Sequence, residues 1–466
     1  MDLTFQELLH IDLLPCEFRG DPSLLAQSIA GFCIDSRVMQ ANQTFIAIKG
    51  DRHDGHEFIA EVMAKGARAT VVSRAWYLQQ LGQVPPGNYF LVDDTLVALQ
   101  AIARYYRQKF DIPLLALTGS NGKTTTKEMI AAVLSQKWQI LKNPGNLNNH
   151  IGVPLTLLEL TATHDAGVIE MGTNHLGEIA RLAEIACPTA GLITNIGPAH
   201  LEFFGSLQGV FEAKTELWRY LERHGGVAFV NVDDPLLRGK LPNGPRIITY
   251  GFENPAQVSG QFLGLDGEGR AAFAVSDVTI RLEIVGMHNI YNALAAVAVG
   301  LEFNLTLSQI KTALERFLPA SKRMEVIRST GMVIINDCYN SNPESARKAL
   351  LTLSQMKTTG KRIAVLADML ELGQWSQSEH QAIGQYAAAL GNIDWLFTYG
   401  PLSQLTASQA QRDGVKHVFH FDDKSSLIQQ LKPVIAEGDV ILIKGSRGMA
   451  MEQVTSALLA GSQPSS

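Results

Sequence analysis

The chain has 466 residues, 46% of them hydrophobic, and its 39 basic and 45 acidic side chains give a formal net charge of −6. This length exceeds what one compact core can use and predicts about three domains, while the apolar content excludes disorder over most of the chain. No Lys/Arg-rich run is present, which argues against a nucleic-acid partner.

The N-terminal stretch does not have the features of a targeting segment. The first ten residues include acidic side chains and lack the basic and apolar regions of a secretory signal, and no apolar run is long enough to span a bilayer. The four cysteines lie far apart without a CxxC pair, so neither a zinc site nor a disulfide framework is indicated. We therefore expect a cytoplasmic protein that does not insert into a membrane.

Apolar runs alternate with helix-periodic segments along the chain, which predicts α/β domains with largely parallel sheets. Two boundaries, near 109–113 and 318–322, divide the chain into domains 1–110, 111–320 and 321–466. The proline of the first boundary disfavours helical geometry in the residue before it. Expected strands are 44–50 and 69–73, then 114–119, 166–172, 190–197, 226–234 and 246–252, then 332–337, 362–368, 395–400 and 439–445.

The strongest local motif is TGSNGKTT at 118–125, between an expected strand and an expected helix. Its glycines allow backbone N–H groups to point at phosphate oxygens, the helix N-terminus favours anions, Lys123 adds charge, and Thr124 can bind Mg²⁺. The loop is shorter than GxxxxGK[ST], and the alternative is an ordinary glycine turn with a solvated lysine. The residues expected at a nucleotide are Gly119, Ser120, Asn121, Gly122, Lys123, Thr124 and Thr125.

Three further side chains are candidates. Glu170 ends an apolar strand, where it could hold Mg²⁺ or be a solvated acid, and His200 follows another strand, where it could simply cap a turn. Lys214 falls within an apolar helical stripe that runs from residue 207 to residue 221. An ammonium there either extends to solvent or is recruited into an active site.

Together these motifs resemble the Mur ligase family of amide-forming enzymes, whose nucleotide loop is TGTNGKT-like. The resemblance covers essentially the whole chain and implies a UDP-substrate domain, a central P-loop ATPase domain and a Rossmann-like C-terminal domain. It implies that Lys123 and Thr124 serve ATP phosphates and Mg²⁺, and that Glu170 and His200 serve Mg²⁺, with two ions expected. It also implies a carbamylated Lys214. Catalytic roles are thereby expected for Lys123, Lys214 and His200.

The resemblance also assigns the rest of the ATP site. The run at 287–296 matches the helix beside the adenine, where Asn289 and Asn292 lie three residues apart and can face one way, although Asn289 could also cap the helix. Arg323 and Asp337 match positions that contact ATP from the C-terminal domain. Lys322 stands where family members usually have glycine.

The tracts at 143–154 and 169–179 most resemble the members that add D-alanyl-D-alanine to UDP-N-acetylmuramoyl-tripeptide. The expected reaction uses ATP to form an acyl phosphate, which the dipeptide amine attacks to give the pentapeptide precursor of peptidoglycan. The expected substrate contacts, each of which could instead be a solvated loop residue, are Ser36, Arg37, Lys49, Asp54 and His56 for the UDP group, Asn146, Asn148 and Asn149 for the muramoyl group, Asn174 and His175 for the peptide, and Asn340 and Asn342 for the dipeptide.

Other functions stay open on sequence grounds. The nearest alternative is the neighbouring ligase that adds the third amino acid, although its DNPR signature is absent. A folylpolyglutamate synthetase would lack the long first domain. A nucleotide-dependent switch or binding module would need neither the lysine in the apolar stripe nor three substrate-type domains, and no NKxD motif is present. A UDP-sugar-binding protein with a decayed ATPase is disfavoured by the intact GKTT, Glu170 and Lys214. We expect a bacterial monomer whose C-terminal domain closes on the central domain when ligands bind.

Overall fold

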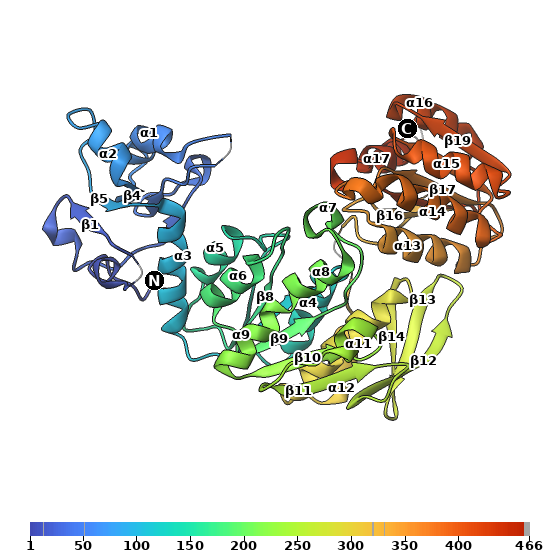
Figure 1. The fold of residues 1–466 in the computed structure, drawn as a ribbon, viewed down its shortest axis with the longest axis horizontal. Coiled ribbons are helices and arrows are strands. Elements are labelled where there is room, and N and C mark those ends of the chain that lie inside the picture. Colours follow the sequence, from blue (N-terminus) through green and yellow to red (C-terminus); the bar gives the residue numbers. More distant parts are fainter. Residues whose placement is uncertain (13, 51, 319–320, 330, 461–466) are drawn as a thin grey trace.

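The computed structural model describes residues 1–12, 14–50, 52–318, 321–329 and 331–460. Three β-sheets, each with its own helices, follow one another along the chain and form a curved molecule (Figure 1). The central part forms the base, and the N-terminal and C-terminal parts rise on either side of it. No helix of the described residues is long and apolar enough to cross a membrane. The predicted three-part α/β fold is confirmed.

The N-terminal part contains a five-stranded sheet in the order β1-β5-β4-β3-β2, parallel except for β1 at its edge. Its strands are β1 Glu17–Arg19, β2 Phe32–Cys33, β3 Thr44–Ile46, β4 Ala69–Ser73 and β5 Tyr89–Val92. Its helices are η1 Glu7–His10, η2 Pro22–Leu24, η3 Ser36–Val38, η4 Gly55–Phe58, α1 Ile59–Ala64, α2 Arg74–Gln79 and α3 Thr95–Gln108.

The last of these helices, α3, joins the first two parts (Figure 1). It is buried on most of its surface and also packs on α5 and α6 of the central part. Near its end the buried Arg107 guanidinium donates hydrogen bonds to the carbonyl oxygens of Ala186 at 3.1 Å, Phe110 at 2.6 Å and Ile112 at 2.9 Å. These bonds fix the segment that leads from α3 to the central sheet.

The central part holds a nine-stranded sheet in the order β14-β13-β12-β11-β10-β9-β6-β8-β7. Strands β6 to β12 are parallel, whereas β13 and β14 add antiparallel hairpins at one edge. The strands are β6 Leu114–Thr118, β7 Ile140–Lys142, β8 Ala166–Glu170, β9 Ala190–Ile193, β10 Val227–Asn231, β11 Arg246–Gly251, β12 Val258–Leu265, β13 Arg270–Val275 and β14 Val278–Val285. The helices are α4 Lys123–Leu134, α5 Gly152–Leu157, α6 Glu178–Ala186, α7 Leu201–Phe204, α8 Leu207–Lys214, α9 Glu216–His224, α10 Pro235–Gly239, α11 His288–Glu302 and α12 Leu307–Glu315.

The C-terminal part has a Rossmann-like fold. Its six-stranded sheet has the order β15-β16-β20-β17-β18-β19 and is parallel except for β15. Its strands are β15 Glu325–Ser329, β16 Met332–Asp337, β17 Arg362–Ala367, β18 Trp395–Tyr399, β19 His417–Phe421 and β20 Val440–Lys444. Its helices are α13 Pro343–Gln355, η5 Gly373–Trp375, α14 Ser376–Ala389, α15 Ser403–Arg412, α16 Lys424–Leu431, η6 Lys432–Val434, η7 Arg447–Met449 and α17 Glu452–Ala460.

One local prediction needs correction. The apolar stripe from residue 207 to residue 221 suggests one helix, whereas the structure has two, α8 and α9, separated at Thr215. Lys214 is therefore the last residue of α8 rather than an interior position of a longer helix. Its neighbour Thr215 has ψ near −1°, which is enough to interrupt the helical geometry.

Candidate active site

The nucleotide loop lies between β6, in the middle of the central sheet, and α4. Gly119 and Gly122 have φ of 149° and 80°, in the region that favours glycine. A Cβ at Gly119 would lie 1.8 Å from Thr194 Oγ1, and one at Gly122 would lie 2.5 Å from Asn292 Oδ1. The loop can therefore have this shape only with glycine at both positions.

Lys123 is held against its own loop. Its Nζ donates to the carbonyl oxygens of Gly119 at 2.8 Å and Ser120 at 3.4 Å. Burial lowers the pKa of the Lys123 amine, Glu170 opposes this effect, and Arg323 adds to it. A bound phosphate would supply the anion that this buried ammonium lacks.

A cavity of about 1070 Å³ lies beside the loop and is lined by residues of both the central and C-terminal parts. It gathers most of the side chains predicted from the sequence. Those that line it are Ser120, Asn121, Gly122, Lys123, Thr124, Thr125, Asn146, Asn148, Asn149, Glu170, Asn174, His200, Asn289, Asn292, Arg323, Asp337, Asn340 and Asn342. Three of the predicted site residues of these two parts do not line the cavity: Gly119, His175 and Lys214.

Glu170 ends β8 with its side chain almost wholly buried. Its Oε1 accepts a hydrogen bond from Asn148 Nδ2 at 2.8 Å, and its Oε2 lies 3.8 Å from Lys127 Nζ. Oε2 is buried without a hydrogen-bond partner among the described residues. A carboxylate oxygen free in this way, next to Thr124 in one cavity, fits a Mg²⁺ ion. Within the described ranges, no group of three or more His, Cys, Asp or Glu side chains is arranged to hold a metal, so phosphate and water oxygens would complete the coordination.

Lys214 is 1% exposed at the end of α8. Burial lowers the pKa of its amine well below the ordinary value, and the nearby charge of Lys123 lowers it further. No hydrogen bond or ion pair of the Lys214 side chain is found among the described residues. The Lys214 side chain does not extend to solvent. The structure therefore excludes the interpretation in which this ammonium is solvated.

The start of α11 closes the other side of the nucleotide loop. Asn292 Nδ2 donates to Asn289 Oδ1 at 2.9 Å, and Asn292 Oδ1 accepts from Thr126 Oγ1 at 3.1 Å. Asn289 Nδ2 donates to the carbonyl oxygen of Val285 at 2.8 Å. The two asparagines share one face of the helix, as their spacing predicts, and link that face to α4.

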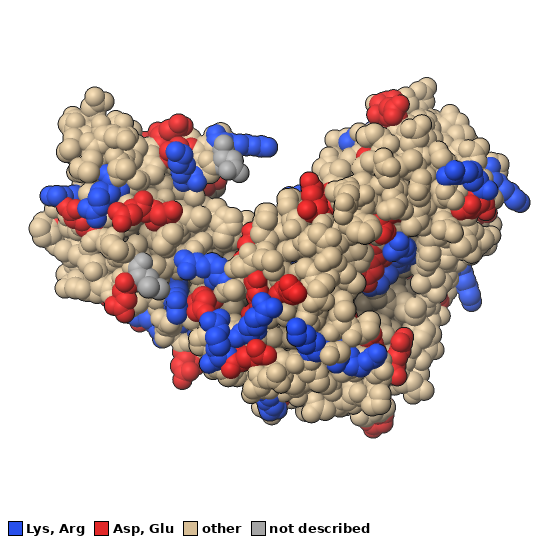
Figure 2. Space-filling view, viewed as in Figure 1, with Lys and Arg blue, Asp and Glu red and all other residues tan. Residues whose placement is uncertain are grey.

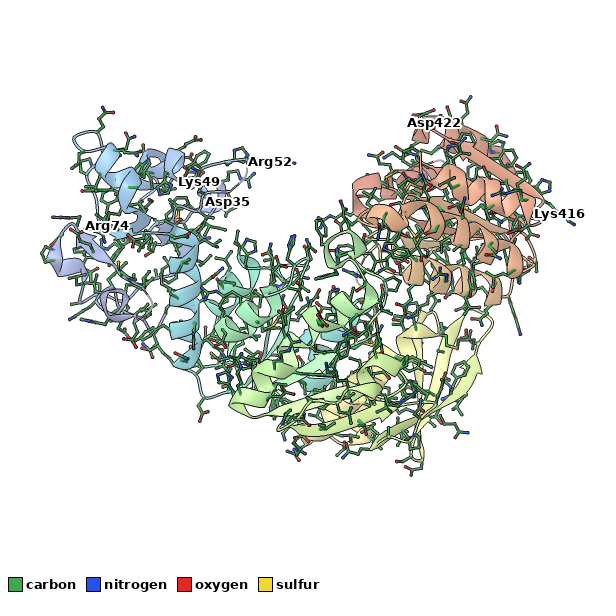
Figure 3. The ribbon with its side chains drawn as sticks, viewed as in Figure 1. Asp35, Lys49, Arg52, Arg74, Lys416 and Asp422 are labelled. Carbon is green, nitrogen blue, oxygen red and sulfur yellow. The ribbon has the colours of Figure 1, made fainter. Side chains whose placement is uncertain are left out.

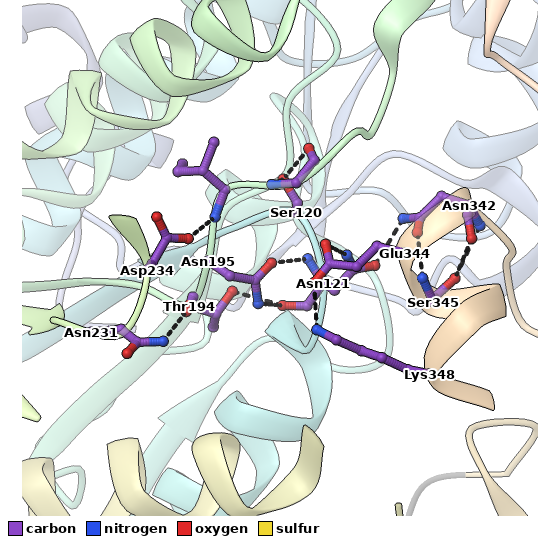
Figure 4. Close-up of polar contacts among 12 residues, drawn as sticks. Ser120, Asn121, Thr194, Asn195, Asn231, Asp234, Asn342, Glu344, Ser345 and Lys348 are labelled. Carbon is purple, nitrogen blue, oxygen red and sulfur yellow. Dashed lines mark hydrogen bonds and ion pairs between the residues drawn. The ribbon is translucent and has the colours of Figure 1, made fainter. Parts of the chain in front are cut away.

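The C-terminal part contacts the nucleotide loop directly through Asn121 (Figure 4). Asn121 Nδ2 donates to Glu344 Oε2 at 2.8 Å, and its Oδ1 accepts from Asn342 Nδ2 at 2.8 Å. Its backbone N–H donates to Asn195 Oδ1 at 3.0 Å, and Lys348 pairs with Glu344 from the next turn of α13. One loop side chain thus connects two parts of the molecule.

A second contact between these parts involves His200. Its Nδ1 lies 2.6 Å from Glu371 Oε2, and the hydrogen bond lowers the pKa of that carboxyl although burial opposes it. His200 and Glu371 both have positive φ, 52° and 63°. Positive φ in non-glycine residues costs energy and is often found at functional sites. In this structure His200 is therefore engaged by a carboxylate of the C-terminal part.

Asp337 and Arg323 lie on the C-terminal side of the cavity, each with a partner. Asp337 Oδ2 is 2.6 Å from the nearly buried Nζ of Lys444, which also donates to the carbonyl oxygen of Asn340 at 2.8 Å. The Arg323 guanidinium stacks over the Tyr339 ring at 3.7 Å. Lys444 also lines the cavity and was not among the predicted site residues, although its position at the end of a buried strand is one where ligand-contacting groups occur.

The residues predicted to contact UDP form a separate group on the N-terminal part. Asp54 Oδ1 is 2.6 Å from His56 Nδ1, and His56 Nε2 accepts from the backbone N–H of Ser73 at 2.9 Å, so both ring nitrogens are occupied. Ser36 Oγ contacts Glu61, and Arg37 pairs with Asp35. None of them lines the cavity described above.

The N-terminal and C-terminal parts lie on either side of a hollow (Figure 2). Lys49, Asp35 and Arg52 lie on the side of the N-terminal part that borders this space (Figure 3). Basic side chains project into the same hollow in the space-filling view (Figure 2). An elongated anionic ligand could extend from this face to the cavity.

Comparison with known proteins places every part of the chain in one family. Residues 28–107 match the model for the Mur ligase family catalytic domain, residues 117–300 the Mur ligase middle domain, and residues 322–447 the Mur ligase glutamate ligase domain.

The curated relatives include two UDP-N-acetylmuramoyl-tripeptide--D-alanyl-D-alanine ligases. The one from Bacillus subtilis (strain 168) is 37% identical over 94% of this chain and 95% of its own length. The one from Escherichia coli (strain K12) is 39% identical over 91% of this chain and 92% of its own length.

Solved structures agree with this. MurF from Acinetobacter baumannii superposes with a TM-score of 0.86 at 31% identity, covering 98% of both chains. The MurF ligase from Thermotoga maritima in complex with ADP superposes with a TM-score of 0.82 at 29% identity, covering 92% of this chain and 97% of that one.

Proposed function

Because this chain belongs to the Mur ligase family, we propose that it is the ATP-dependent ligase that joins D-alanyl-D-alanine to UDP-N-acetylmuramoyl-tripeptide. The product, UDP-N-acetylmuramoyl-pentapeptide, is a precursor of peptidoglycan. The relatives from Bacillus subtilis and Escherichia coli carry this activity in their names and match over nearly their full lengths. The observation that carries the proposal is the single cavity that combines the nucleotide loop, the asparagine-rich tract at 146–149 and the C-terminal segment at 337–345.

The reaction requires activation of a carboxylate. The terminal carboxylate of the tripeptide attacks the γ-phosphorus of ATP, which gives an acyl phosphate and releases ADP. The amine of D-alanyl-D-alanine then attacks the acyl carbon, loses a proton and expels phosphate through a tetrahedral intermediate. Because the first two reactants are both anionic, the protein acts mainly by positioning them and neutralising charge, and Lys123 is placed for this at the loop.

Thr124 and Glu170 are the residues proposed to hold Mg²⁺, with His200 as a further ligand. When bound, the ion would neutralise phosphate oxygens. Asn148 orients the Glu170 carboxylate through its hydrogen bond and leaves Oε2 available. Because Glu371 engages Nδ1 of His200, the ring nitrogen that would bind an ion is Nε2, and the Glu371 carboxylate would then hold the imidazole in place.

Lys214 is proposed to be carbamylated. Burial and the charge of Lys123 lower the pKa of the Lys214 amine, which favours the neutral amine that attacks CO₂ and then loses a proton to give a carbamate. The modification would replace an unpaired cation by an anion beside Lys123. It would also turn the charge conflict between two buried lysines into an attraction.

The C-terminal part is proposed to move relative to the central part during turnover. The Asn121 contacts to Glu344 and Asn342 and the contact between His200 and Glu371 are the polar links that such a motion would break or reform. Scattering curves that do not change when an ATP analogue and the UDP-substrate are added would count against this motion.

The remaining assignments stay predictions. The domain limits at 110 and 320, the UDP contacts of the N-terminal group, the peptide contacts of Asn174 and His175, and a monomeric cytoplasmic enzyme are proposed on the basis of the sequence.

The proposed reaction is tested by measuring phosphate release from ATP with UDP-N-acetylmuramoyl-tripeptide, with and without D-alanyl-D-alanine, together with the mass of the product. We expect phosphate release that depends on the dipeptide, a pentapeptide product, and loss of both in Lys123→Ala. Turnover of a UDP-dipeptide with a single amino acid instead would assign the chain to the neighbouring ligase.

A further inference from the structure

Lys127 is a fully buried lysine that the proposed reaction does not use. It lies on α4, one turn beyond Lys123, and its side chain is 0% exposed. Its Nζ donates to the carbonyl oxygens of Asn143 at 2.7 Å and Gly145 at 3.0 Å. The same atom lies 3.2 Å from Glu128 Oε1 and 3.8 Å from Glu170 Oε2.

Helix stability does not account for this burial. A buried ammonium is unfavourable unless charges and hydrogen bonds compensate it, and an apolar side chain of similar length could fill the same space. The neighbouring Lys142 also pairs with Glu128, from a position 42% exposed to solvent. Glu128 therefore has a cation without Lys127, and the distinct contacts of Lys127 are those to the 143–149 segment and to Glu170.

Hydrogen bonds fasten the 143–149 segment to β8, and Lys127 holds the beginning of this segment. Asn143 Oδ1 accepts from the backbone N–H of Glu170 at 2.9 Å, and Asn143 Nδ2 donates to the carbonyl oxygens of Leu147 at 2.9 Å and Glu170 at 3.0 Å. Asn148 then bonds the Glu170 carboxylate. Lys127 secures the carbonyl oxygens on either side of Pro144, where the chain turns.

The segment that Lys127 holds contributes Asn146, Asn148 and Asn149 to the cavity. Lys127 itself does not line the cavity, so it touches no ligand there. Its helix begins with the nucleotide loop, so one side chain connects the loop's helix, the asparagine segment and the Glu170 carboxylate.

We propose that Lys127 is a positioning residue that fixes the 143–149 segment against Glu170 and thereby sets the affinity for the UDP-linked substrate and, at saturating Mg²⁺, not that for ATP. This inference rests on the proposed function, because it assigns the asparagine segment to the muramoyl substrate. The Lys127 amine does not contact the nucleotide loop, so we expect the loop to keep its glycine geometry and its contacts with Asn195 and Asn292 when Lys127 is replaced.

The experiment compares Lys127→Met with the control Lys142→Met, which removes the other lysine paired with Glu128. Steady-state kinetics at saturating Mg²⁺ give the KM for UDP-N-acetylmuramoyl-tripeptide and for ATP separately, so that a change at the Glu170 carboxylate does not limit ATP binding. For Lys127→Met we expect the KM for the UDP-substrate to rise about tenfold or more, since two hydrogen bonds from a charged group are lost, and the KM for ATP to stay within about twofold. Lys142→Met should change neither value.

Hydrogen exchange without any ligand provides a readout that does not depend on activity. The backbone amides of 145–150 should exchange faster in Lys127→Met than in the wild type, while those of 119–126 and those of the control stay unchanged. If the methionine variant does not fold, Lys127→Gln replaces it in both experiments. Glutamine keeps a hydrogen-bond donor but is too short to reach the carbonyl oxygens of both Asn143 and Gly145. The KM of Lys127→Gln for the UDP-substrate should rise about threefold to fivefold.

The outcomes are distinguishable. A wild-type enzyme that does not turn over the UDP-tripeptide would refute the proposed function, and the exchange experiment would still test the positioning role. A wild-type enzyme that turns over, with variants whose UDP-substrate KM is unchanged or whose two KM values rise equally, would overturn the inference. Unaltered exchange of 145–150 would overturn it as well.

Discussion

Replacing Lys214 by methionine should stabilise the folded protein although it should abolish ligation. The folded-state pKa of Lys214 is depressed by burial and by Lys123, relative to an ordinary value of 10.5. As pH falls below 10.5, the unfolded chain binds a proton more readily than the folded chain, so the wild type loses stability toward neutral pH. Exchanging an unpaired buried ionisable group for an apolar side chain of similar length is worth about 1–4 kcal/mol.

The assay is thermal unfolding in CO₂-depleted buffer at pH 7 and pH 9.5. For a domain of about 150–250 residues, such as the central part, the expected gain corresponds to a rise in Tm of about 2–16 °C at pH 7. The difference should shrink at pH 9.5, because there the unfolded lysine is less completely protonated. Added bicarbonate should raise the Tm of the wild type if Lys214 is carbamylated, and should leave the methionine variant unchanged.

Lys416→Met serves as the control, because Lys416 is exposed on the C-terminal part (Figure 3) and the change should move Tm very little. A Lys214→Met protein that melts below the wild type in CO₂-depleted buffer at pH 7 would refute the reasoning. That result would mean that the Lys214 ammonium has a stabilising partner.

Three further changes follow from contacts described above. Asn121→Ala removes the two hydrogen bonds to the C-terminal part, which are worth about 2–4 kcal/mol together. Small-angle scattering of the unliganded protein should therefore show a more open molecule, and scattering curves that superimpose on those of the wild type would contradict this. Asn148→Ala leaves the Glu170 carboxylate without the hydrogen bond that orients it. The Mg²⁺ concentration for half-maximal activity should therefore rise about 10- to 100-fold, and an unchanged magnesium titration would count against the orienting role of Asn148. In Glu7, burial raises the pKa but hydrogen bonds from Lys109, Thr4 and Tyr105 outweigh it and lower the pKa to about 2 from 4.5. The stability that this carboxylate contributes is therefore present above pH 4.5 and lost as pH falls through 2, so wild type and Glu7→Gln should differ in urea midpoint at neutral pH and converge at pH 2.

The strands that carry the site could be predicted because they are buried on both faces and read as continuous apolar runs. The segments that end in Thr118, Glu170, Asp337 and Lys444 are of this kind, and the structure places strands there. The antiparallel hairpins β12 to β14 were missed, although the sequence VTIRLEIV of β14 alternates apolar and polar residues in the way that predicts a half-buried strand.

The interrupted helix at Thr215 was also missed. Both α8 and α9 place apolar residues on one continuous stripe, so the periodicity alone does not reveal the break. The unfavourable position of Lys214 within that stripe was nevertheless recognisable, and its burial bears this out.

Partners that are distant in sequence could not be predicted. The contacts of Asn121 with Glu344 and of His200 with Glu371 span more than 170 residues and depend on how two sheets are placed relative to each other. Lys127 is indistinguishable in sequence from a solvated helix lysine. Only the fold shows that its helix carries it beneath the 143–149 segment.

The double packing of α3 bears on how chimeric proteins could be designed from this chain. A junction placed after residue 110 would transfer α3 with the N-terminal sheet and expose the face that now packs on α5 and α6. It would also separate Arg107 from its acceptors at Ala186 and Ile112. A junction in the loop before α3, near residue 94, would keep this helix and its guanidinium with their central partners. Exchange of the N-terminal part between homologous proteins should therefore give soluble hybrids with the earlier junction and aggregation-prone ones with the later junction.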